Sequence, residues 1–393
     1  MKTSIVLYSL LIFSFFSINS LKSQIPEQQI SFAMESKPHS YYVEQAELWS
    51  KELAKDSLSE NAWYNYFRSC RNSQGTADWR SDFVNESDYL MEGGDIVKLM
   101  HQYIPETFMD YYLSYLTNGV GTDSSEELLK AYAMNPKFPG IHSSVISYAE
   151  SSMNYELRKS VNKTWYDTNF ISYQLLDYSY NVLNSLEENA IIFIQNDNDS
   201  YPLWMLQDAK NIRTDVLPIS LDFLLLDEYR DNIFETLNIK PLELGNIDID
   251  EYHQNWEKVV EHIVNNYQGE RNIYMGMTLF QHLYEKYSNN LYVSGLALRY
   301  SKEKIDLTDY NKNLIENVFL TDYLQFPFMN ERNQMNINYQ NFNYVSCFKE
   351  VFELYKNNNE PEKAEELKKT SLLLAERVGN PNLVESVKKE FEE

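Results

Sequence analysis

The hydrophobic pattern of this chain changes its period between residues 189 and 230, and this change constrains the fold most strongly. A short apolar run at 191–194 is followed by a polar stretch, by 201–207, and by a second apolar run at 216–219. Short apolar runs bounded by polar residues are typical of buried strands, whereas apolar residues three or four positions apart indicate helices. The stretch therefore predicts strand, polar loop, helix and strand.

The flanks of this central unit carry helical periodicity. Residues 41–187 and 306–393 place small and aromatic residues at three- and four-residue spacing, and 344–356 pairs with 362–378 across a polar turn. This arrangement resembles tetratricopeptide repeats, in which stacked helical hairpins bury a shared core. Because the spacing of the copies is irregular, we expect tetratricopeptide-like hairpins and not a regular array.

The central unit, residues 188–305, contains further strand signals. Residues 272–276 read as a third strand, and 291–293 with 296–300 read as two strand pieces on either side of Gly295. Helices are expected at 221–234, 250–267 and 280–287. Pro218 predicts that the second strand either lies at an edge or ends early, because proline cannot donate to a sheet ladder. The expected fold class is mainly α, with helical flanks around a small α/β unit whose parallel or mixed sheet has about four strands.

The N-terminus predicts export. A short basic start precedes an apolar segment at 5–18, and small residues stand at its end and after it, at Ser17, Ser20 and Ser23. This is the pattern of a signal peptide, and fourteen residues fall short of the roughly 20 that span a bilayer. We expect cleavage after Ser23, a flexible leader at 24–40 and no transmembrane segment in the mature chain, with an uncleaved anchor as the alternative.

Charge and cysteine content limit the partners and the covalent chemistry. The formal net charge of -24 makes the chain repel phosphate backbones, so no nucleic-acid partner is expected. Cys70 and Cys347 permit one disulfide in an oxidising compartment, although two buried thiols are the favoured state.

The polar loop after the first strand has two interpretations. In the structural one, Asp199 or Ser200 caps a helix and Pro202 takes its first position. In the functional one, Asp197 and Asp199 form an Asp-X-Asp element that holds a divalent cation, with Asn196 and Asn198 supplying further oxygen ligands. Ligands bind at the carboxyl ends of the strands in open α/β sheets, which is where this loop lies.

Complete catalytic motifs are missing from the sequence. It has no glycine-rich phosphate loop, no Gly-X-Ser-X-Gly turn and no Cys-X-X-Cys pair. The expectation therefore leans away from an enzyme, and a divalent cation is the one cofactor that the loop could hold.

Residues 196–207, followed by Ile212-Arg213-Thr214-Asp215-Val216, resemble a known family. It is a bacterial membrane-protein family of unknown function, described as protein O-mannosyltransferase-like, whose soluble C-terminal region carries Gly-Asp-Asn-Asp-Thr-Phe-Pro-Leu-Trp and Arg-X-Asp-Val. Residues 294–299 are similar to its Gly-Leu-Ala-Tyr-Arg segment. The resemblance implies a shared accessory module and carries over no catalytic residue. Asn196 stands where the family has glycine, so the backbone conformation of this loop could differ from that of the family.

The leading functional prediction is an exported, non-enzymatic interaction or assembly module in the periplasm or cell envelope, with a protein partner there. The alternative is a protein, or an enzyme, that binds a nucleotide sugar or glycan with the help of a divalent metal. Its site would comprise Asn196, Asp197, Asn198, Asp199, Trp204 and Arg213, with Asp197 and Asp199 as metal ligands.

Overall fold

The computed structural model describes residues 25–32, 34–77, 89–119, 125–245, 252–326 and 334–392. The predicted signal peptide lies outside these residues. The chain divides into two compact units, one built from the N-terminal part up to Gly93 and the other mainly from Gly94 onward.

The first unit is a helical hairpin that holds an extended segment. Helix α1 (His39–Lys55) packs along α2 (Glu60–Thr76), and the Ser59 side chain caps α2. Residues 27–32, within the predicted leader, run along the hairpin. The backbone amides of Gln29 and Phe32 donate to the Asn65 and Asn72 side chains over 2.5 Å and 3.2 Å. Amide side chains of α2 thus form the hydrogen bonds to the segment's backbone that a neighbouring strand would otherwise form.

The second unit begins with helices that pack mainly as sequential pairs. Their bounds are α3 (Gly93–His101), α4 (Phe108–Asn118), α5 (Ser125–Met134), α6 (Ile141–Ser151), α7 (Tyr155–Tyr166) and α8 (Tyr173–Asn184). Helix α4 packs on α5, and α6 packs on α7. Helix α8 then delivers the chain to the sheet.

The sheet has five short strands in the described part of the chain, one more than the number expected. They are β1 (Ile191–Ile194), β2 (Leu217–Ser220), β3 (Ile273–Gly276), β4 (Leu291–Ser294) and β5 (Ala297–Tyr300). Their order is β2-β1-β3-β5-β4, with β1 parallel to β2 and β3, and with β5 antiparallel to β3 and β4. Strand β2 lies at an edge, which is one of the two alternatives that Pro218 predicts.

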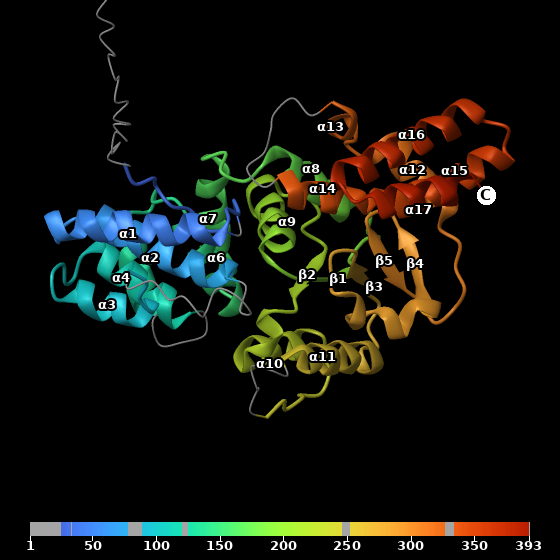
Figure 1. Cartoon of the computed structure of the whole chain (residues 1–393). Coiled ribbons are helices and arrows are strands. Elements are labelled where there is room, and N and C mark those ends of the chain that lie inside the picture. The colour runs from blue at the N-terminus through green and yellow to red at the C-terminus, as the bar shows by residue number, and fades with distance from the viewer. Residues whose placement is uncertain are drawn as a thin grey trace, which may run out of the picture. The chain divides into compact units, whose positions relative to one another are not determined.

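Alternating side chains of the sheet face two helical layers. Ile191, Phe193 and Met275 pack with α10 (Asp227–Thr236) and α11 (Tyr252–Asn266). Ile192 and Ile194 face α8 and α9 (Asp197–Lys210) on the other side. Figure 1 shows these two pairs of helices on opposite sides of the strands. Burial of both faces explains why the parallel strands read as continuous apolar runs.

The C-terminal part is helical and returns to the sheet. It comprises α12 (Thr308–Asn313), the π-helical turn η5 (Leu314–Val318), α13 (Asp322–Gln325), α14 (Gln334–Phe342), α15 (Tyr344–Asn357), α16 (Pro361–Val378) and α17 (Pro381–Glu392). Helices α15, α16 and α17 pack as consecutive hairpins, and Gly379 ends α16 in a left-handed conformation. The predicted fold class, mainly α with a small mixed sheet, is confirmed.

Two predicted helices differ in detail. The stretch expected as one helix at 221–234 forms a 3-10 turn, η1 (Phe223–Leu225), before α10 begins at Asp227. The stretch 280–287 forms two 3-10 segments, η3 (Gln281–Leu283) and η4 (Glu285–Asn290).

Both cysteines are buried and free, which confirms the favoured prediction. Burial raises the pKa of the Cys70 thiol to about 11, so this thiol is protonated at neutral pH. Within the described ranges, no helix is both long enough and apolar enough to cross a membrane.

Candidate functional site

The turn between β1 and α9 lies at the carboxyl end of the central parallel strand. Asn196 adopts φ 67° and ψ 164°, which reverses the chain so that α9 begins at Asp197. The Asn196 amide donates to the Asp222 carboxylate, which follows β2, over 2.9 Å. The turn therefore keeps a backbone conformation that glycine favours, although asparagine occupies it.

The predicted capping scheme for this helix is wrong. No side chain caps α9 at Asn196, both acidic residues lie in its first turn, and Pro202 lies inside the helix. The tight turn at Asn196 allows the helix to start before the residues expected to cap it. Carboxylates in a first turn are stabilised by the positive end of the helix dipole, and they also leave this end unfavourable for a phosphate.

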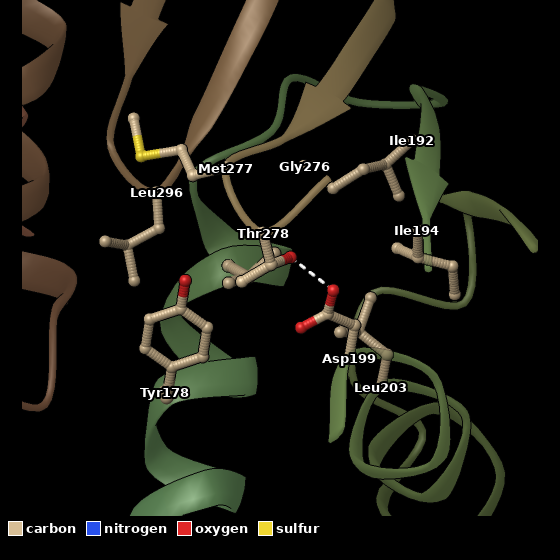
Figure 2. A pocket seen from close by; sticks show the side chains of 10 residues that line it. Tyr178, Ile192, Ile194, Asp199, Leu203, Gly276, Met277, Thr278 and Leu296 are labelled. Atoms are coloured by element: carbon tan, nitrogen blue, oxygen red, sulfur yellow. Dashed lines mark hydrogen bonds between the residues drawn. The ribbon is translucent and has the colours of Figure 1, made fainter. Parts of the chain in front are cut away.

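Asp199 is buried and joins three distant parts of the chain. Its carboxylate accepts hydrogen bonds from the Thr278 hydroxyl, after β3, and from Gln340 Nε2 of α14 at 3.0 Å. Figure 2 shows the carboxylate pointing at Thr278, with Tyr178 of α8 on the other side of the pocket. Burial raises the pKa of Asp199 to about 7, although the hydrogen bonds from Thr278 and Gln340 oppose the shift.

This cluster occupies the position at which open α/β sheets bind ligands. The chain runs from β1 to its neighbour β2 and then returns past β1 to β3 on its other side, so the crevice between the ends of β1 and β3 is the topological switch point. The cavity there measures about 10 Å³, and Asp199, Thr278 and Leu203 line it. Such a cavity is about the size of one water molecule. The protein's own side chains therefore fill the crevice.

Asp197 has different surroundings. Its side chain is exposed by area, although protein atoms surround the carboxylate closely, and it interacts with Tyr201. This crowding and the nearby Asp222 carboxylate raise the pKa of Asp197. Since helix residues two positions apart point in different directions, Asp197 and Asp199 do not face one another. The structure instead places Asp197 near Asp222, a residue that the motif analysis missed.

The other predicted site residues lie elsewhere. Asn198 follows Asp197 in the first turn of α9 and is partly exposed. Trp204 is fully buried, and its ring stacks on Phe223 at 6.1 Å. Trp204 therefore belongs to the core and not to an open site.

Arg213 lies at the amino ends of the parallel strands, away from the polar loop. Its guanidinium donates to the carbonyl oxygens of Leu183, Leu186 and Glu187 and forms an ion pair with Asp215 at 2.9 Å. Asp215 in turn accepts the Asn189 amide over 2.8 Å. Arg213 thus fixes the entry of the chain into β1, and the structure does not bring it together with Asp197.

A buried charged cluster also escaped the sequence analysis. Arg158 of α7 lies between Glu150 of α6, with which it forms an ion pair, and Asp208 of α9 at 2.9 Å. Asn162 and Tyr229 complete its hydrogen bonds. Burial raises the pKa of Glu150, and Arg158 opposes that shift. The cluster ties the α6–α7 hairpin to the α/β layers, which is a structural role.

The described residues contain no group of three or more His, Cys, Asp or Glu side chains that could hold a metal ion. Around the loop, Asp197 is exposed, its neighbour Asp222 is half-buried, and Asp199 is buried and hydrogen-bonded. A cation at this loop would therefore depend on Asp197, Asp222 and backbone or amide oxygens.

Comparison with known proteins places this unit near one family. A family model described as TMEM260-associated domain 2 matches residues 175–290. That stretch is similar to a TMEM260-like family. The match spans α8, the parallel strands and α11, and it overlaps the region that carries the resemblance noted in the sequence. Neither the curated proteins nor the solved structures contain a match to the chain.

Proposed function

We propose that the chain is an exported, non-enzymatic interaction or assembly module of the periplasm or cell envelope. The observation that carries this proposal is the exposed apolar face of α14. Its inward side buries Ile337 together with Gln340 and Asn341, whereas Met335 and Tyr339 are 61% and 51% exposed. Residues four apart lie on one helix face, so Met335 and Tyr339 together present an apolar surface to solvent.

Exposed apolar side chains also precede α14. Leu320 is 45% exposed and Phe326 is 62% exposed, on either side of α13. Scattered apolar residues are normal on a surface, but exposed apolar side chains that share one helix face favour a surface that meets a partner. Gln340 anchors the inward side to Asp199, which keeps the apolar side outward.

A site-specific crosslinker tests this proposal. A photoreactive residue at Tyr339 should give one discrete product with an envelope protein, whereas the same residue at Met134, an exposed apolar position on α5, should not. Met335→Ser should remove the product without changing the melting temperature. Recovery of uncrosslinked monomer alone from Tyr339 would count against the proposal.

Export is tested separately by the mass of the chain recovered from the envelope fraction. Loss of residues 1–23 is expected, and an intact N-terminus would contradict cleavage there. The similarity to the TMEM260-like family supports an accessory role beside a membrane protein. The narrower link to protein O-mannosyltransferase-like proteins is part of this proposal.

A second candidate function is binding of a divalent cation, or of a metal-bound nucleotide sugar or glycan, at the Asp197 loop. It is favoured by the proximity of Asp197 and Asp222, whose charges repel at the carboxyl ends of β1 and β2. A bound cation would relieve this repulsion and raise the melting temperature by mass action. Thermal-shift scans with Ca²⁺, Mn²⁺ and sugar nucleotides should show a rise that Asp197→Asn abolishes. An equal rise in the parent and in Asp197→Asn would refute the site.

A further inference from the structure

Strand β4 ends the sheet with one side unpaired by any other described strand. Figure 1 shows it at the margin of the sheet, beyond β5. On this outer side the Val293 carbonyl accepts Asn311 Nδ2 at 2.9 Å, and the Gly295 amide donates to Asn311 Oδ1 at 2.7 Å. The amide group of Asn311 thus takes the place of one residue of a neighbouring strand.

The outer edge extends beyond the part that Asn311 covers. Because the N–H and C=O of a strand residue point to the same side, the Val293 amide also points outward, as do the backbone groups of Leu291. The β4–β5 pairing has Val293 opposite Leu298, and the turn at Gly295 closes the Ser294–Ala297 pair, which agrees with this alternation. Leu291 and Val293 therefore offer backbone groups that a further extended segment could pair with.

A cavity of about 290 Å³ lies beside this edge. It is lined by Tyr292 and Val293 of β4, by residues 304–308 and by Glu350 of α15. Among the described backbone bonds, the segment after β5 reaches this hairpin only through the Ser301 amide and the Asn290 carbonyl, at 2.8 Å. The volume is near the lower end of the range for ligand pockets and is enough for one long side chain with its backbone.

The charge of the cavity selects the kind of side chain. Glu350 accepts Asn311 Nδ2 at 2.7 Å, and among the described residues no Lys or Arg side chain forms an ion pair with its carboxylate. Burial raises the pKa of Glu350, and the like charge of the nearby Asp306 adds to this rise. Lys304 is the one basic side chain in the lining, and its charge acts on the Asp306 carboxylate. A cationic group in the cavity would compensate Glu350.

We propose that this cavity receives an arginine or lysine side chain of a partner polypeptide whose backbone lies in extended form along β4. Backbone pairing with Leu291 and Val293 gives the segment its direction, and Glu350 selects its charge. The net charge of -24 also favours approach of a basic partner. This edge is separate from the outward face of α14, so the proposal goes beyond the interaction surface described above.

Acetylated and amidated tripeptides provide the test. Val-Arg-Val should shift the amide resonances of residues 291–293 and 304–308 in the full chain, and Val-citrulline-Val, a neutral counterpart of similar shape, should bind about tenfold more weakly or not at all. Agmatine, which carries the guanidinium without a peptide backbone, should also bind much more weakly. Equal binding of the citrulline peptide would refute the charge selection, and equal binding of agmatine would refute the backbone pairing.

Variants of α15 provide the matched control. Glu350→Gln keeps an acceptor for Asn311 and should weaken Val-Arg-Val binding about tenfold, whereas Glu353→Gln, on the same helix and paired with Lys349, should not. Unchanged binding by a folded Glu350→Gln protein would overturn the proposal. If this variant fails to fold, the comparison of peptides on the parent protein still decides. Met335→Ser should leave peptide binding intact, which separates this test from that of the α14 face.

Discussion

Asn196 provides the sharpest test of how the β1–α9 turn is built. Its φ of 67° and ψ of 164° lie in a region that side chains other than glycine rarely enter, and residues held there cost about 1–3 kcal/mol. Its side chain is exposed and does not cap α9, so replacing it sacrifices no capping bond. Glycine has more conformational freedom than asparagine in the unfolded chain, and this lowers the stability of the folded protein by about 0.4–1 kcal/mol. Asn196→Gly should therefore raise the free energy of unfolding by about 0.5–2 kcal/mol.

Urea denaturation and thermal melting measure this change. A gain of this size should raise the melting temperature by about 1–4 °C for a unit of this length. Asn198→Gly is the matched control, because it places glycine in the first turn of α9, where the loss is about 0.5–1 kcal/mol. A loss of stability in Asn196→Gly equal to that in Asn198→Gly would refute the strain argument.

Three further predictions concern buried groups. Because the folded pKa of Asp199 is about 7, above its usual value, its contribution to stability is lost as pH rises from about 4 to 7. The urea midpoint of the parent protein should therefore fall over this pH range, and Asp199→Asn should flatten the fall. Parallel plots of urea midpoint against pH for the two proteins would contradict this prediction. Arg158→Met leaves Glu150 and Asp208 uncompensated and should cost about 3–5 kcal/mol, whereas a loss below 1 kcal/mol would show that water reaches them. Gly295→Ala should destabilise the β4–β5 hairpin, because φ of Gly295 is 57° and the added methyl group would meet Ser185. Hydrogen exchange of the backbone amides in β4 and β5 should become faster, and unchanged exchange would refute this prediction.

Much of the fold follows from local pattern. The apolar runs at 191–194 and 216–219, the third strand at 272–276 and the pair around Gly295 all correspond to strands in the structure. Burial on both faces makes such runs apolar throughout, and their short length between polar residues favours strands over helices. The start of α9 was misplaced because a positive φ at an asparagine carries no local sequence signal that distinguishes it from an ordinary turn residue.

The site was predictable only in part. The loop after β1 was found because the carboxyl end of a central strand is where polar residues converge. Asp222 follows β2 in the same way and could have been found by applying that argument to the second strand. Gln340 could not, since it is 141 positions from Asp199 and meets it only through packing of α14 against the α/β unit. The hydrogen bond between Gln340 and Asp199 helps to fill the crevice with the protein's own side chains.

The two margins of the sheet also bear on aggregation. Pro218 removes a backbone donor from β2 at one margin, and Asn311 occupies part of the β4 backbone at the other. Exposed strand margins are templates for uncontrolled polymerisation, and proline or a covering side chain blocks them. Among the described strands, the limited stretch of β4 beside Val293 is the part of these margins that stays open. Asn311→Ala should therefore expose more of β4 and promote self-association.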